Sequence, residues 1–108
     1  MLTELPLPIQ CFFNAETVSP DAVAMCFDKN GEVKDEKQTY SGYDAIKKWH
    51  YESTKKYSYS VTPISFDNIA NHIIVLSKVS GNFDGSPIKL RYFFSLVGNK
   101  ISSLEICQ

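Results

Sequence analysis

The feature that most constrains the fold of this chain is a change of hydrophobic period near Tyr57. Before this residue, apolar side chains recur three and four positions apart, as they do along one face of a helix. After it no helical period survives, and long stretches read as strands. Helices followed by strands that are joined through hairpins indicate an α+β protein with an antiparallel sheet, which can carry helices on one face.

The first half of the chain predicts three helices. One begins after Pro6 and Pro8, and a second is begun by the hydroxyl cap, proline and carboxylate of Ser19-Pro20-Asp21. A turn at Asn30-Gly31, an extended stretch over residues 32–40 and a sequence similar to a capping box at residues 41–44 precede the third. The three helices are expected around the apolar stripe Ile9, Phe12, Phe13 and Glu16, over residues 22–27, and over residues 42–56 with the stripe Ile46, Trp49, His50 and Ser53.

The second half predicts three or four long strands, near residues 57–67, 72–80, 88–97 and 100–107. A two-residue turn at Gly98-Asn99 and a longer loop over residues 81–87 form the hairpins. In the third strand Leu90, Tyr92, Phe94 and Leu96 share one face, and Lys89, Arg91, Phe93 and Ser95 share the other. Because aromatic side chains lie on both faces, the sheet has more apolar surface than one layer of helices can cover. The surplus implies a ligand cavity or a dimer interface.

Length and composition exclude several classes of protein. The 108 residues, of which 44% are hydrophobic, suit one domain over residues 1–108. Eleven basic and twelve acidic residues leave a net charge of -1, so we expect neither nucleic acid nor a membrane as a partner. Three cysteines without a Cys-x-x-Cys spacing, and an N-terminus without signal-peptide features, indicate a cytoplasmic protein with buried structural thiols.

Motifs that carry a known chemistry are scarce. No phosphate-binding loop or dinucleotide fingerprint occurs, and His50 and His72 are not spaced as metal ligands, so we expect no cofactor and no metal. His50, on the stripe of the third helix, fits a packed histidine better than a catalytic base. Asp35-Glu36 stands shortly before Trp49, and a carboxylate beside an indole would have its pKa raised toward the range of a general base. Spacing alone favours two solvated loop carboxylates instead.

The order of several segments resembles the SnoaL-like branch of the nuclear transport factor 2-like superfamily. These segments are LPLPIQCFFNAE, DAVAMCF, VKDEKQTYSGYDAIKKW, VSGNFDGSPIKLRYFFSL and KISSLEI, and they span essentially the whole chain. The resemblance implies three N-terminal helices packed in the concave face of a curved antiparallel sheet, forming a cone with a deep apolar pocket. Members of the superfamily include ketosteroid isomerases, polyketide cyclases, dehydratases and epoxide hydrolases, and dimers are common among them.

The resemblance also implies a role for one carboxylate. Asp35, in VKDE, matches the general base of the isomerase members. The tyrosine that donates to the oxyanion in those members falls here at Cys11 or Phe12, and their protonated acid aligns with Arg91. Because these donors supply much of the rate, steroid isomerase activity is not expected.

We therefore expect a small-molecule pocket protein, an isomerase, cyclase or hydrolase that acts on a small apolar or carbonyl-containing substrate with Asp35 as general base. The alternative is a noncatalytic ligand-binding or dimeric interaction module. The residues expected to line the pocket are Phe12, Trp49, Tyr57, Arg91 and Phe93.

Two expectations concern the sheet. Arg91 either faces the pocket, where it would lower the pKa of Asp35, or lies on the outer face and pairs with Glu105 or Asp67. A homodimer is expected through the sheet face. The residues assigned to that interface are Tyr92, Phe94, Leu96, Leu104 and Ile106.

Overall fold

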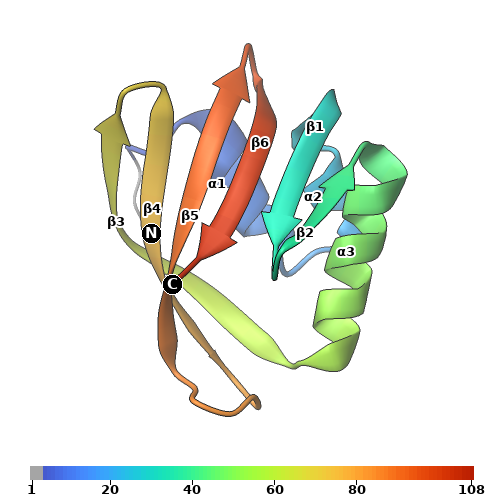
Figure 1. The fold of residues 1–108 in the computed structure, drawn as a ribbon, viewed down its shortest axis with the longest axis vertical. Coiled ribbons are helices and arrows are strands. Elements are labelled where there is room, and N and C mark those ends of the chain that lie inside the picture. The colour runs from blue at the N-terminus through green and yellow to red at the C-terminus, as the bar shows by residue number, and fades with distance from the viewer. Residues whose placement is uncertain (1–3) are drawn as a thin grey trace.

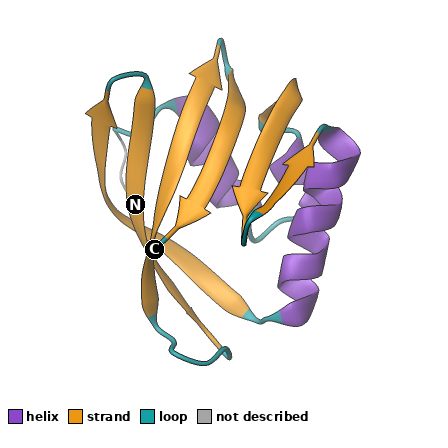
Figure 2. Ribbon diagram, viewed as in Figure 1, coloured by secondary structure: helices purple, strands orange, loops and turns teal. Residues whose placement is uncertain are grey.

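The computed structural model describes residues 4–108 and confirms the α+β class, with helices in the first half and strands dominating the second (Figure 1). The elements in chain order are α1 (Leu7–Ala15), α2 (Pro20–Ala24), β1 (Phe27–Asp35), β2 (Gln38–Ser41), α3 (Tyr43–Lys56), β3 (Tyr59–Ile69), β4 (His72–Gly81), β5 (Ile88–Val97) and β6 (Lys100–Cys107). Figure 2 shows α1 and α2 behind the curved sheet and α3 along its side, next to β2.

Local chemistry explains where the helices begin. Pro8 lies in the first turn of α1, where its missing N–H costs no hydrogen bond. At α2 the side chain of Ser19 accepts a hydrogen bond of 3.0 Å from the backbone N–H of Ala22, which confirms the N-cap predicted from the sequence. At α3 the predicted capping box is absent, because Gly42 is the N-cap residue and no side chain caps the helix.

The sheet is mixed rather than wholly antiparallel. Its strand order is β2-β1-β6-β5-β4-β3, and every neighbouring pair is antiparallel except β1 and β6, which run parallel. The predicted extended stretch is in fact the hairpin of β1 and β2, whose turn residues Glu36 and Lys37 have φ of 51° and 67°. The expected turn at Asn30-Gly31 lies within β1, where the pairing with β6 shifts register between Phe27 and Glu32.

The core forms between α1 and the face of β5 that carries Tyr92 and Phe94. Phe12 of α1 is fully buried, and its ring centroid lies 5.5 Å from that of Phe94 and 6.2 Å from that of Tyr92. Phe12 is therefore a core residue, and the prediction that it lines the pocket is wrong. Phe93 and Arg91 occupy the opposite face of β5, next to Glu105 and Cys107 of β6.

Two expectations about the sheet are corrected by this packing. Tyr92, Phe94 and Leu104 are only 4%, 0% and 1% exposed, because the helices cover them, so they cannot form the expected dimer interface. The homodimer itself stays a prediction. Arg91 is exposed on the outer face, and within residues 4–108 it forms no ion pair with Glu105 or Asp67.

The cysteines differ in their surroundings. Cys26 is buried, as expected, whereas Cys11 and Cys107 are exposed and contradict the expectation of buried thiols. The sulfur atoms of Cys11 and Cys26 lie 2.7 Å apart. Burial, followed by the contact with Cys11, raises the pKa of Cys26 to about 12. Across residues 4–108, no helix has the length and apolar character needed to cross a membrane.

Candidate active site

A cavity of about 570 Å³ opens between α3 and the concave face of the sheet. Its wall combines residues of α3 with the first residues of β3, the end of β1, the loop between β4 and β5, and the inner face of β5 and β6. The residues that line it are Glu16, Asp35, Glu36, Tyr40, Trp49, Glu52, Ser53, Lys56, Tyr57, Tyr59, Val79, Asn82, Phe83, Asp84, Ile88, Leu90, Tyr92 and Ile106.

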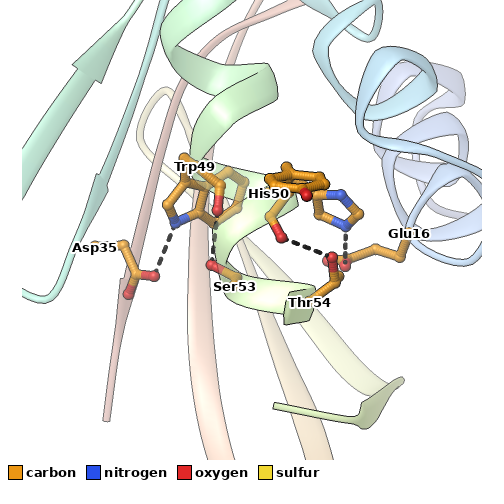
Figure 3. A network of polar contacts seen from close by, with 7 residues as sticks. Glu16, Asp35, Trp49, His50, Ser53 and Thr54 are labelled. Carbon is orange, nitrogen blue, oxygen red and sulfur yellow. Dashed lines mark hydrogen bonds and ion pairs between the residues drawn. The ribbon is translucent and has the colours of Figure 1, made fainter. Parts of the chain in front are cut away.

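Asp35 is the last residue of β1, and its half-buried carboxylate lies on the cavity wall. The indole Nε1–H of Trp49 donates a hydrogen bond of 3.0 Å to its Oδ2 atom (Figure 3). Burial raises the pKa of Asp35 above its usual value, and the bond from Trp49 opposes this shift because it stabilises the charged form. Of the two alternatives for Asp35, the structure shows the carboxylate beside the indole. The solvated loop carboxylates that spacing favoured are found only at the exposed Glu36.

A second carboxylate on the wall, Glu16, is held by His50. The Nε2 atom of His50 lies 3.1 Å from Oε2 of Glu16, and the two side chains are 2% and 9% exposed. An ionised carboxylate only accepts hydrogen bonds, so Nε2 is assigned as the donor here. The buried Nδ1 atom has no partner within residues 4–108. His50 is buried and does not line the cavity, which agrees with its interpretation as a packed histidine. Its contact also positions the carboxylate of Glu16.

Four tyrosines line the cavity, and two of them, Tyr59 and Tyr92, have phenols with a raised pKa. Tyr59 of β3 is half-buried and Tyr92 of β5 is 4% exposed. Burial first, and then the charges of Glu16 and Asp35, raise the pKa of both phenols, so both remain protonated near neutral pH. Neither hydroxyl has a hydrogen-bond partner within the described residues, so each is free to bind a ligand that enters the cavity.

Three of the six residues named from the sequence line the cavity: Asp35, Trp49 and Tyr57. Phe12 lies in the core, and Arg91 and Phe93 lie on the outer face of the sheet.

The sequence did not assign Glu16, Tyr59 or Tyr92 to the pocket, although each carried a signal that could have placed it there. Glu16 ends the stripe of the first helix, Tyr59 shares the strand face of Tyr57, and Tyr92 alternates with Arg91 and Phe93. Within the part of the chain that the structure describes, no three His, Cys, Asp or Glu side chains are grouped as metal ligands.

The sequence matches no model of a protein family and no curated protein, but solved structures resemble the chain closely. A candidate polyketide cyclase from Sinorhizobium meliloti is 33% identical, with 95% of each chain covered and a TM-score of 0.90. A protein from Catenulispora acidiphila with a ketosteroid isomerase-like fold, solved in complex with trimethylamine, is 19% identical, with 95% of this chain and 85% of that chain covered and a TM-score of 0.83. A nuclear transport factor 2-like protein of unknown function from Cytophaga hutchinsonii is 16% identical, with 98% of this chain and 92% of that chain covered and a TM-score of 0.70.

Helices packed on the concave face of a curved sheet, with a cavity at one end, define the cone-shaped α+β class of pocket proteins. Together with the 33% identity to the Sinorhizobium meliloti protein, this architecture shows that the chain belongs to the nuclear transport factor 2-like superfamily, in its SnoaL-like branch.

Proposed function

We propose that this protein is an enzyme in which Asp35 removes a proton from a small carbonyl-containing substrate bound in the cavity. The observation that carries the proposal is the half-buried carboxylate of Asp35, which lies on the cavity wall with a raised pKa and is oriented by Trp49. A general base works best when its pKa approaches the operating pH, and burial moves that of Asp35 in this direction.

The phenols of Tyr59 and Tyr92 fit the second requirement of this chemistry. When Asp35 takes a proton from the carbon next to a carbonyl, the electron pair moves to the carbonyl oxygen and forms an enolate. Protonated phenols that face the cavity can donate hydrogen bonds to that oxygen. If Asp35 returns the proton to another carbon, the reaction is an isomerisation. If the enolate carbon attacks a second carbonyl of the same substrate, a ring closes, and the proton goes to the new alkoxide oxygen.

The size of the cavity and the relatives support this class of reaction. A volume of about 570 Å³ is within the roughly 300–1,000 Å³ that is common for small-molecule sites. The Sinorhizobium meliloti relative is a candidate polyketide cyclase, which supports the cyclase form of this reaction. The complex of the Catenulispora acidiphila protein with trimethylamine supports the binding of small organic molecules in this fold.

The test is exchange of a carbon-bound proton with solvent. Carbonyl compounds that raise the melting temperature of the protein are incubated with it in D₂O, and loss of the C–H signal is followed by proton NMR. We expect Asp35→Asn to slow the exchange about a hundredfold or more. The matched control, Asp67→Asn, makes the same change at an exposed carboxylate outside the cavity and should leave the rate within about threefold. Exchange at the wild-type rate in Asp35→Asn contradicts the proposal, and binding without any exchange supports the noncatalytic alternative.

A further inference from the structure

The cavity wall has a charge that differs sharply from that of the chain as a whole. The chain has a net charge of -1, whereas the wall contains five carboxylates and a single basic side chain, Lys56. The carboxylates are those of Glu16, Asp35, Glu36, Glu52 and Asp84. Within residues 4–108, none of them forms an ion pair with Lys or Arg, and only Glu16 is hydrogen-bonded to a histidine, His50. Four acidic side chains therefore face one cavity without a protein cation bound to them.

Aromatic rings alternate with these acids on the same wall, at Tyr40, Trp49, Tyr57, Tyr59, Phe83 and Tyr92. The face of an aromatic ring attracts cations. One such contact exists within the protein, because Nζ of Lys56 lies 5.1 Å from the centroid of the Tyr57 ring. The ring of Phe83 lies edge-on to Tyr57 at 5.8 Å, so two aromatic side chains and an ammonium group already meet at this wall.

An independent observation concerns the Tyr92 hydroxyl. The side chain is 4% exposed, it lines the cavity, and its hydroxyl has no hydrogen-bond partner within the described part of the chain. The side chain is buried, but its hydroxyl oxygen is accessible from the cavity, so this unused donor favours a ligand that carries an oxygen acceptor. The cavity thus combines one free donor with a wall that repels anions.

We propose that the cavity takes an organic cation, an amine or quaternary ammonium compound with an apolar body and an oxygen acceptor that bonds to Tyr92. An anionic ligand would meet five carboxylates and one ammonium group on this wall, and a neutral one would desolvate carboxylates without compensating them. The inference rests on the proposed function, in that it names the substrate class of the same cavity.

A series of three compounds of equal shape tests the charge preference. Choline carries a positive charge, 3,3-dimethylbutan-1-ol is its uncharged carbon isostere, and 3,3-dimethylbutanoate is an anion of similar size. Trp49 is the single tryptophan of the chain, and its indole N–H bonds to Asp35, so its NMR resonance reports binding directly. We expect choline to bind at least about fivefold more tightly than the alcohol and the anion not to bind, with choline affinity falling as salt rises.

Two double variants, each of which removes two negative charges, show whether the preference for choline comes from the cavity wall. Glu52→Gln with Asp84→Asn removes two exposed carboxylates of the wall, and Asp67→Asn with Glu105→Gln removes two exposed carboxylates outside it. The first pair should weaken choline binding about threefold to tenfold and leave binding of the alcohol unchanged, and the second should change neither. Equal loss in both variants would show that only the net charge of the protein matters, and would overturn the inference.

The failure of this inference is separate from failure of the proposed reaction. Binding of the alcohol or the anion as tightly as choline, or no shift of the indole resonance with any of the three, overturns the cationic substrate class. Proton exchange that depends on Asp35 would then still support the enzyme. A clear preference for choline together with unchanged exchange in Asp35→Asn supports the inference and contradicts the reaction.

Discussion

Trp49 and His50 are consecutive residues of α3, and each holds a different carboxylate of the cavity wall (Figure 3). Trp49 donates to Asp35 at the end of β1, and His50 bonds to Glu16, which directly follows α1. Consecutive side chains of a helix diverge by about 100°, so one helical turn reaches two different elements. The position of α3 therefore sets the placement of both carboxylates together.

Removing the indole donor should raise the pKa of Asp35 further. The hydrogen bond from Trp49 lowers this pKa, whereas burial raises it, so Trp49→Phe leaves the effect of burial less opposed. The carboxyl carbon of Asp35, followed by NMR through a pH titration, reports the shift. Tyr40→Phe is the control, because Tyr40 packs beside Trp49 and its hydroxyl bonds to Gln38 rather than to Asp35. An unchanged or lower pKa in Trp49→Phe would refute this account.

The raised pKa of Asp35 also gives a sign for the pH dependence of stability. Between the usual value of 3.8 and the raised value in the folded state, the folded protein binds this proton more tightly than the unfolded chain does. The free energy of unfolding therefore decreases as pH rises through this window and levels off above it. Asp35→Asn removes the effect, so we expect the variant to gain stability over wild type at pH 7 and to gain less below pH 3.8. Urea unfolding of both proteins at the two pH values measures the difference, and a gain that is equal or larger in acid would contradict the expectation.

The three helices and the four strands of the second half could be predicted from the sequence because they depend on local signals, whereas the β1–β2 hairpin and the parallel pairing of β1 with β6 were not predicted. The hydroxyl of Ser19, the turn at Gly98-Asn99 and the alternation along residues 88–97 each act over a few residues. The face of β5 that points inward could not be predicted, because both faces carry an aromatic side chain. Arg91 and Phe93 were assigned to the pocket, whereas α1 covers the face with Tyr92 and Phe94.

The contacts of Trp49 with Asp35 and of His50 with Glu16 also differ in how well the sequence could predict them. Asp35 and Trp49 are separated by one hairpin and part of a helix, and their proximity was one of the two alternatives that the sequence offered. Glu16 and His50 are 34 residues apart and meet only through the packing of α1 and α2 beside α3. Each lay on the apolar stripe of its own helix, but no local pattern shows that two stripes face each other.

The contact between Glu16 and His50 should contribute to stability through its burial. Glu16→Ala leaves a buried imidazole with neither nitrogen bonded, and we expect a loss of about 1–3 kcal/mol in the free energy of unfolding. Glu16→Gln, which keeps an acceptor of the same length, should lose less. Combining Glu16→Ala with His50→Leu removes both polar groups, so the losses should not add, with a coupling of about 0.5 kcal/mol or more in urea unfolding. Strict additivity would show that the contact contributes nothing.

The hydroxyl of Tyr92 should matter for activity and not for stability. Because it has no partner within residues 4–108, Tyr92→Phe removes no hydrogen bond from the protein, and the free energy of unfolding should stay the same or increase. If the hydroxyl donates to the enolate oxygen, the same change should slow proton exchange about tenfold to a thousandfold. Ser77→Ala is the control, since it removes a hydroxyl that is buried, has no partner within residues 4–108 and does not line the cavity. It should leave exchange unchanged. Equal rates in Tyr92→Phe and wild type, with stability preserved, would remove Tyr92 from the site and leave Tyr59 as the other of the two phenols proposed to donate to the enolate oxygen.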